Sequence, residues 1–149
     1  MNRRQAMSAL GALPLAWALP VSASTATIEV FKSATCGCCT AWVKHMQAAG
    51  FTVKATNVAD PGDVRASRGM PDRYASCHTA LVGGYVVEGH VPAADVSRLL
   101  AQRPAALGLA VPGMPSGAPG MEGGRSQPFD VVLVETGGTS RVYAHYAPR

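Results

Sequence analysis

The residues with the clearest chemistry are four cysteines, three of which stand within four positions, at Cys36, Cys38 and Cys39. A disulfide that closes a two-residue loop removes little chain entropy, so this spacing is unsuited to a structural cross-link. Thiolates are nucleophiles and ligands of soft metals, and the spacing therefore favours a redox or metal site. A redox pair uses only two thiols and leaves Cys38 surplus, whereas a third thiolate can bridge two copper ions.

The elements around this motif must place its thiols. Alternating β-branched and aromatic residues predict a strand over 27–31 that leads directly into the cysteines. Apolar residues at helical spacing then predict a helix over 38–49, ended by Gly50. The cysteines thus begin a helix, where free N–H groups and the macrodipole favour the ionised thiolate. There Cys36 and Cys39 can face one side and either bind a metal or form a disulfide.

A second pair of ligand types, Cys77 and His78, precedes a predicted hairpin over 79–88 that turns at a Gly-Gly pair. Taken singly, both residues would more often be buried structural residues. An α/β fold with this order of elements brings the segment before the hairpin against the first helix, so the pair would complete a multi-ligand site. His90, beyond the hairpin, is a further candidate ligand, with a structural role beside the next helix as its alternative.

Two methionines, Met114 and Met121, lie in a glycine- and proline-rich segment over 108–124, which we call the methionine loop. Core methionines occupy periodic apolar faces, and these two do not. Thioethers bind Cu(I) but hardly compete for Zn(II), so a ligand role would favour copper. The alternative is that they pack the loop onto the surface of the domain. Zinc also stays an alternative, because sites of four cysteines or of three cysteines and a histidine are common.

The remaining patterns define a fold class. They predict a second strand over 51–56, a short helix over 61–67 and a helix over 92–102. Strand, helix, strand, helix, hairpin, helix, with Cys-x-x-Cys at the first junction, is the order of a thioredoxin-like α/β fold. A second hairpin, formed by 129–134 and 141–146, extends this core beyond the methionine loop.

The N-terminus predicts export. Arg3 and Arg4 precede an apolar run over 9–19 and small residues, which predicts a cleaved signal peptide at 1–23 and one domain over 24–149. The apolar run is shorter than the roughly 20 residues that span a bilayer, so a permanent membrane anchor is the weaker alternative. Without the two arginines the net charge falls from +4 to +2, and the remaining basic residues are scattered. This distribution argues against nucleic-acid binding and against a polybasic membrane patch.

Four separated segments carry a resemblance to a known family. They are 36–43 (CGCCTAWV), 76–92 (SCHTALVGGYVVEGHVP), 108–115 (GLAVPGMP) and 119–123 (PGMEG). Together they are similar to the CopG family of bacterial periplasmic copper-resistance proteins, long catalogued as a domain of unknown function. The resemblance extends over nearly the whole mature chain.

The resemblance implies a periplasmic, thioredoxin-like protein that binds several Cu(I) ions in a cysteine-bridged cluster. It would act in copper resistance by sequestration, transfer or redox conversion of copper, with copper ions and other periplasmic copper-handling proteins as partners. The implied ligands are Cys36, Cys38, Cys39 and Cys77, with contributions from His78, His90, Met114 and Met121. The alternatives are a thiol-disulfide oxidoreductase in which Cys36 attacks and Cys39 resolves, and a structural zinc site.

Overall fold

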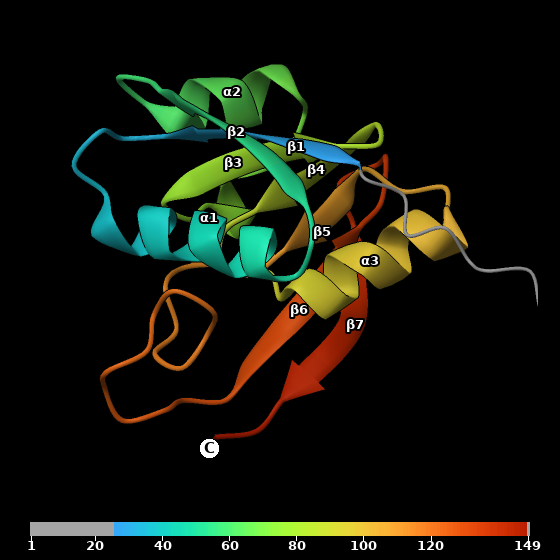
Figure 1. Cartoon of the computed structure of the whole chain (residues 1–149). Coiled ribbons are helices and arrows are strands. Elements are labelled where there is room, and N and C mark those ends of the chain that lie inside the picture. The colour runs from blue at the N-terminus through green and yellow to red at the C-terminus, as the bar shows by residue number, and fades with distance from the viewer. Residues whose placement is uncertain (1–25, 149) are drawn as a thin grey trace, which may run out of the picture.

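The computed structural model describes residues 26–148, a mixed α/β structure in which the described strands form one sheet (Figure 1). Its elements are β1 (Thr27–Lys32), α1 (Gly37–Ala48), β2 (Thr52–Asn57), α2 (Pro61–Ser67), η1 (Asp72–Tyr74), β3 (His78–Val82), β4 (Tyr85–Glu88), α3 (Ala93–Gln102), β5 (Gly108–Ala110), β6 (Phe129–Val134) and β7 (Ser140–Tyr146). The sheet has seven strands in the order β2-β1-β3-β4-β5-β6-β7. The predicted signal peptide over 1–23 lies outside the described residues. Within 26–148, no helix is long and apolar enough to cross a membrane.

The first four strands and three α-helices follow the predicted order. β1 and β2 are parallel, so their connection must cross over, and α1 supplies that crossover. β3 and β4 form the predicted antiparallel hairpin, and β3 pairs antiparallel to β1 on the side away from β2. In this register the Cα of Lys32 is opposite the Cα of His78. The C-terminal end of β1, which leads into the cysteine motif, therefore lies beside the N-terminal end of β3, which follows Cys77.

One part of the methionine loop was predicted wrongly, because its first three residues form β5. β5 pairs parallel to β4, and a Cβ at Gly108 would clash with the carbonyl oxygen of Val86. Only glycine permits this approach, and Leu109 next to it is fully buried. β5 also pairs antiparallel to β6, which joins the predicted C-terminal hairpin of β6 and β7 to the same sheet.

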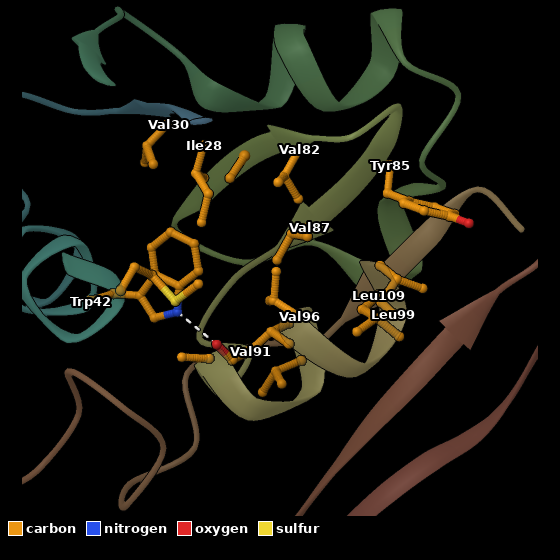
Figure 2. Close-up of a cluster of buried hydrophobic side chains, with 14 of the residues drawn as sticks. Ile28, Val30, Trp42, Val82, Tyr85, Val87, Val91, Val96, Leu99 and Leu109 are labelled. Atoms are coloured by element: carbon orange, nitrogen blue, oxygen red, sulfur yellow. Dashed lines mark hydrogen bonds between the residues drawn. The ribbon is translucent and has the colours of Figure 1, made fainter. Parts of the chain in front are cut away.

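The main core lies between one face of the sheet and the helices α1 and α3, while α2 covers the opposite face (Figure 1). Trp42 and Met46 of α1 are fully buried, as their helical spacing predicts. Burial of a side chain such as Met46 stabilises the fold by about 2 kcal/mol. Figure 2 shows the Trp42 indole beside the chain that follows β4, where its Nε1 donates a hydrogen bond to the carbonyl of Val91 at 2.8 Å. This bond fixes α1 against the segment that carries His90.

Candidate metal centre

The cysteine motif is held by the first turn of α1, as predicted. Cys36 is the N-cap residue, and its Sγ accepts a hydrogen bond from the backbone N–H of Cys39 at 3.3 Å. Thr40 donates from its hydroxyl to the carbonyl of Cys36 at 3.2 Å. The helix start therefore fixes the backbone of the motif, and its first turn contains no acidic residue.

Four sulfur atoms gather at this helix start. Cys36 and Cys39 form a disulfide, and Cys38 and Cys77 are free thiols. The Sγ of Cys38 lies 3.4 Å from that of Cys36 and 3.8 Å from that of Cys77. All four sulfurs lie within 4.8 Å of one another, and we call these four residues the cysteine group. A disulfide sulfur carries no thiolate charge, so all four can act as metal ligands only after the disulfide takes up two electrons.

A second set of ligand atoms adjoins the first. Cys77, His78 and His90 also place one ligand atom each within 4.8 Å of one another, and we call them the histidine group. The Sγ of Cys77 is 3.0 Å from Nε2 of His90 and 3.5 Å from Nδ1 of His78. The two groups therefore share Cys77, which is the one residue of the described chain that belongs to both.

His90 is oriented by the methionine loop. Its Nδ1 lies 2.8 Å from the carbonyl oxygen of Pro119, and a carbonyl can only accept, so Nδ1 carries the proton. Nε2 of the neutral ring then presents its lone pair to Cys77, which is the arrangement of a metal-binding histidine held by an outer hydrogen bond. Burial lowers the pKa of His90 and so favours this neutral form. The carbonyl of Pro119 is a functional group that the sequence analysis missed.

His78 is the most enclosed of the candidate ligands. Its ring lies between Trp42, at 4.5 Å between ring centroids, and His90, at 5.0 Å, and it is fully buried. Burial, together with the charge of His90, lowers the pKa of His78 to about 3. Within residues 26–148, its Nε2 has no hydrogen-bond partner. A buried polar atom without a partner costs about 1–3 kcal/mol, so this neutral imidazole is kept at a cost in stability.

Cys77 itself is a protonated thiol in the metal-free protein. Burial and the nearby Cys38 raise its pKa to about 12. A metal ion that binds this sulfur must therefore displace a proton, as is general for thiol ligands.

Glu88 of β4 holds the backbone beside Cys77 from the opposite face of the sheet. Its carboxylate accepts hydrogen bonds from the N–H of Ser76 at 2.8 Å and the hydroxyl of Thr79 at 2.6 Å. Arg65 of α2 lies 3.6 Å from the same carboxylate. Burial raises the pKa of Glu88, against the effect of these donors. The network fixes the residues on both sides of the Cys77–His78 pair.

The two predicted methionine ligands lie in the loop between β5 and β6, which passes beside α1 (Figure 1). Gly113, before Met114, bonds through its N–H to Ala75 at 2.9 Å and through its carbonyl to the hydroxyl of Ser76 at 2.5 Å. Gly120, before Met121, packs on α1, where a Cβ would lie 2.7 Å from the carbonyl oxygen of Cys38. The Met114 side chain is 55% exposed. The structure thus gathers the six predicted cysteine and histidine ligands, and it anchors the glycines before the two methionines to Ala75, Ser76 and the start of α1.

The chain is similar to known proteins over most of its length. A model of the family described as "Protein of unknown function, DUF411" matches residues 74–121. A comparison with curated proteins finds no match. Two solved structures, "Copper resistance protein copG" in Form 2 and Form 1, each show 45% identity and a TM-score of 0.77 over 81% of this chain. The alignments cover 98% and 97% of those chains, respectively. At this identity and coverage, the chain belongs to the family of the copper resistance protein CopG.

Proposed function

We propose that this protein binds several Cu(I) ions at the cysteine and histidine groups and acts in copper resistance. The observation that carries the proposal is the position of Cys77, whose sulfur belongs to both groups. A thiolate can bridge two ions, and four sulfurs with two imidazoles exceed the four ligands that one tetrahedral ion accepts. Soft sulfur ligands favour Cu(I), so more than one copper ion fits this donor set best.

The cysteine group must be reduced before it can hold copper fully. Two electrons and two protons convert the Cys36–Cys39 disulfide into two thiols, and copper then displaces protons from the thiols that it binds. In the reverse direction, the reduced pair can give two electrons to two Cu(II) ions, which yields two Cu(I) ions and the disulfide. Sequestration, transfer and redox conversion of copper are therefore all within the chemistry of this site.

The setting of this activity is also part of the proposal. The order β1-α1-β2-α2-β3-β4-α3, with the cysteines at the first strand-to-helix junction, supports a thioredoxin-like core. The N-terminal pattern supports a signal peptide at 1–23, a mature domain over 24–149 and a periplasmic location. Other periplasmic copper-handling proteins would then deliver or receive the metal.

Anaerobic titration of the reduced protein with Cu(I), in competition with a chromophoric Cu(I) chelator, tests the proposal. We expect the wild type to bind at least two copper ions and Cys38→Ser to bind fewer, because Cys38 lies between Cys36 and Cys77. Thr35→Ser, at an exposed position of the same loop, is the matched control and should bind as the wild type does. Binding of a single copper ion, or of zinc in preference to copper in metal-replete cells, would contradict the proposal.

One observation favours a second function. The Cys36–Cys39 disulfide at the start of α1 is the arrangement of a thiol-disulfide oxidoreductase, in which Cys36 would attack and Cys39 would resolve. Metal-free protein should then reduce insulin disulfides, and Cys38→Ser should retain that activity. Inert metal-free protein would exclude this alternative.

A further inference from the structure

Lys32, the last residue of β1, is a buried cation without an acidic partner. It is 8% exposed, and its Nζ donates one hydrogen bond, to the carbonyl of Ser33 at 3.1 Å. Within residues 26–148, no carboxylate forms an ion pair with it, whereas Lys54 on the neighbouring strand pairs with Glu29 at the surface. A buried ammonium is costly unless an opposite charge lies near, so this position calls for a partner that a carboxylate does not supply.

The register of the sheet shows which face Lys32 occupies. Side chains alternate along β1, and Ile28 and Val30, which share the face of Lys32, pack against Trp42 of α1. Opposite Lys32 on β3 is His78, a member of the histidine group. Lys32 therefore extends on the α1 face, at the strand end that leads into the cysteine motif.

The residues paired with Lys32 and the helix start that follows β1 contain no carboxylate, and the thiols are the groups there that can become negative. The first turn of α1 contains no acidic residue, the paired residue on β2 is Asn57, and the one on β3 is His78. Besides burial and His90, the charge of Lys32 contributes to the lowered pKa of His78, so its field reaches the ligand groups. Among the side chains gathered at this end of the sheet, the cysteines are those that become anionic when a metal binds.

We infer that Lys32 supplies the counter-charge of the copper-thiolate site, without itself being a ligand. This inference rests on the proposed function. The first Cu(I) ion that binds two thiols releases two protons and leaves a bis-thiolate unit with a charge of −1. The fixed positive charge stabilises that unit. A further copper ion that bridges thiolates already ionised adds a positive charge and makes the cluster less negative, so Lys32 acts mainly on the first step of loading.

Two substitutions in the full, reduced chain separate charge from packing. Lys32→Met removes the charge and keeps the length, and Lys32→Arg keeps the charge. Because a thioether can itself bind Cu(I), Lys32→Gln, which is neutral and adds no soft ligand, is titrated beside Lys32→Met as its control. In competition titrations with Cu(I), we expect the first copper to bind about tenfold more weakly in Lys32→Met, because the neutral side chain no longer attracts the thiolates through the low-dielectric interior. Lys32→Arg should stay close to the wild type, and the total copper bound should be unchanged in both variants.

The stability of the metal-free, reduced protein provides a second measurement. Here Lys32→Met should not lose relative to the wild type, although it loses affinity for the first copper ion. Because Lys32→Met removes an unpaired buried charge, we expect its unfolding midpoint in urea to equal or exceed that of the wild type. A purely structural lysine would give a lower midpoint together with weaker copper binding. Lys32→Gln provides a second neutral variant, and it decides the question should Lys32→Met not fold.

Two results would overturn the inference. One is a first-copper affinity in the neutral variants that equals the wild-type value, and the other is an equal loss in Lys32→Met and Lys32→Arg. In both cases the wild type still binds copper, and the proposed function stands. A wild type that binds no Cu(I) would instead contradict the proposed function itself.

Discussion

The two ligand groups that share Cys77 are built in different ways. The cysteine group takes three of its four sulfurs from the first turn of α1 and includes a disulfide, so one short segment sets its geometry and its redox state. The histidine group is assembled from the two ends of the β3–β4 hairpin and is oriented by a carbonyl of the methionine loop. The first group can be switched by two electrons, whereas the second contains no disulfide and is held by packing and the hydrogen bond from His90.

Removal of the shared ligand should have the largest effect. Cys77→Ser takes a sulfur from both groups, so we expect the affinity for Cu(I) to fall by at least about 100-fold. Each tenfold loss of affinity corresponds to about 1.4 kcal/mol, so this loss corresponds to at least about 2.8 kcal/mol. Cys38→Ser, which affects the cysteine group alone, should lose less. Competition titration of both variants checks this order. Equal losses of affinity would contradict the role of Cys77 as the ligand that both groups share.

The redox state should change how many copper ions bind. With the Cys36–Cys39 disulfide intact, the histidine group and Cys38 remain, so we expect the oxidised protein to bind about one Cu(I) and the reduced protein more. Metal analysis after gel filtration, with free thiols counted in parallel, measures this difference. Identical copper content in both states would remove the distinction between a switchable and a fixed group.

A glycine contact connects the methionine loop to the helix start. Gly120 has φ +86°, and a Cβ there would lie 2.7 Å from the carbonyl oxygen of Cys38 and 2.8 Å from the N of Trp42. Gly123 has φ +113°, and a Cβ at that position would meet nothing within 4 Å. Gly120→Ala should therefore destabilise the protein by about 2 kcal/mol more than Gly123→Ala, since only the former creates a clash. Urea unfolding of the two variants gives the difference.

The same pair of variants tests how His90 is oriented. Gly120 follows Pro119, whose carbonyl accepts the hydrogen bond from His90, so Gly120→Ala should also weaken Cu(I) binding to the oxidised protein. Gly123→Ala should leave it near the wild-type value. A loss in both variants would show that loop conformation in general, rather than this contact, supports the histidine group.

The buried imidazole of His78 should make stability depend on pH. Its pKa is lowered from 6.5 to about 3, so below about pH 6.5 the unfolded chain takes up a proton that the native chain does not. Stability of the metal-free protein should then fall as the pH falls from about 6.5 towards 3, by up to about 1.4 kcal/mol per pH unit. His78→Asn should flatten this dependence in urea unfolding at pH 7 and pH 5. An unchanged slope would contradict the assignment.

The smallest effect is expected at Met114. Because its side chain is 55% exposed, Met114→Ala should change the free energy of unfolding by less than about 0.5 kcal/mol. Its effect on Cu(I) affinity should be about twofold, and that of the more buried Met121 should be larger. Titration of both variants with Cu(I) measures how much each methionine contributes to copper binding. A loss at Met114 as large as that at Cys38 would make it a principal ligand.

Much of the fold could be predicted because its patterns are local. The strand before the cysteines, the helix that they begin and the Gly-Gly hairpin each follow from the spacing of neighbouring residues, and the structure confirms them. β5 could not be predicted in this way. Its three residues show no alternation, and its conformation depends on pairing with β4 and β6, far along the chain.

The candidate site also contains residues that could be predicted from local patterns and groups that could not. The cysteine motif and the Cys77–His78 pair stand out by residue type, so their proximity could be predicted from the order of elements. The hydrogen bond from His90 to Pro119 involves a backbone carbonyl, which leaves no trace in residue type. Burial of Lys32 could not be predicted either, because a lysine at a strand end is ordinarily exposed and only the register with His78 places it inside.

The pairing of β5 with β6 determines where the chain should tolerate insertions. Ala110 and Val132 are partners in the sheet, so the segment between them leaves and re-enters the fold at neighbouring points. Each doubling of the length of such a loop adds only about 0.6 kcal/mol of closure entropy. Insertions at its exposed tip, 122–125, should therefore be tolerated, which makes the tip a suitable place for added sequence such as a fluorescent reporter of copper binding.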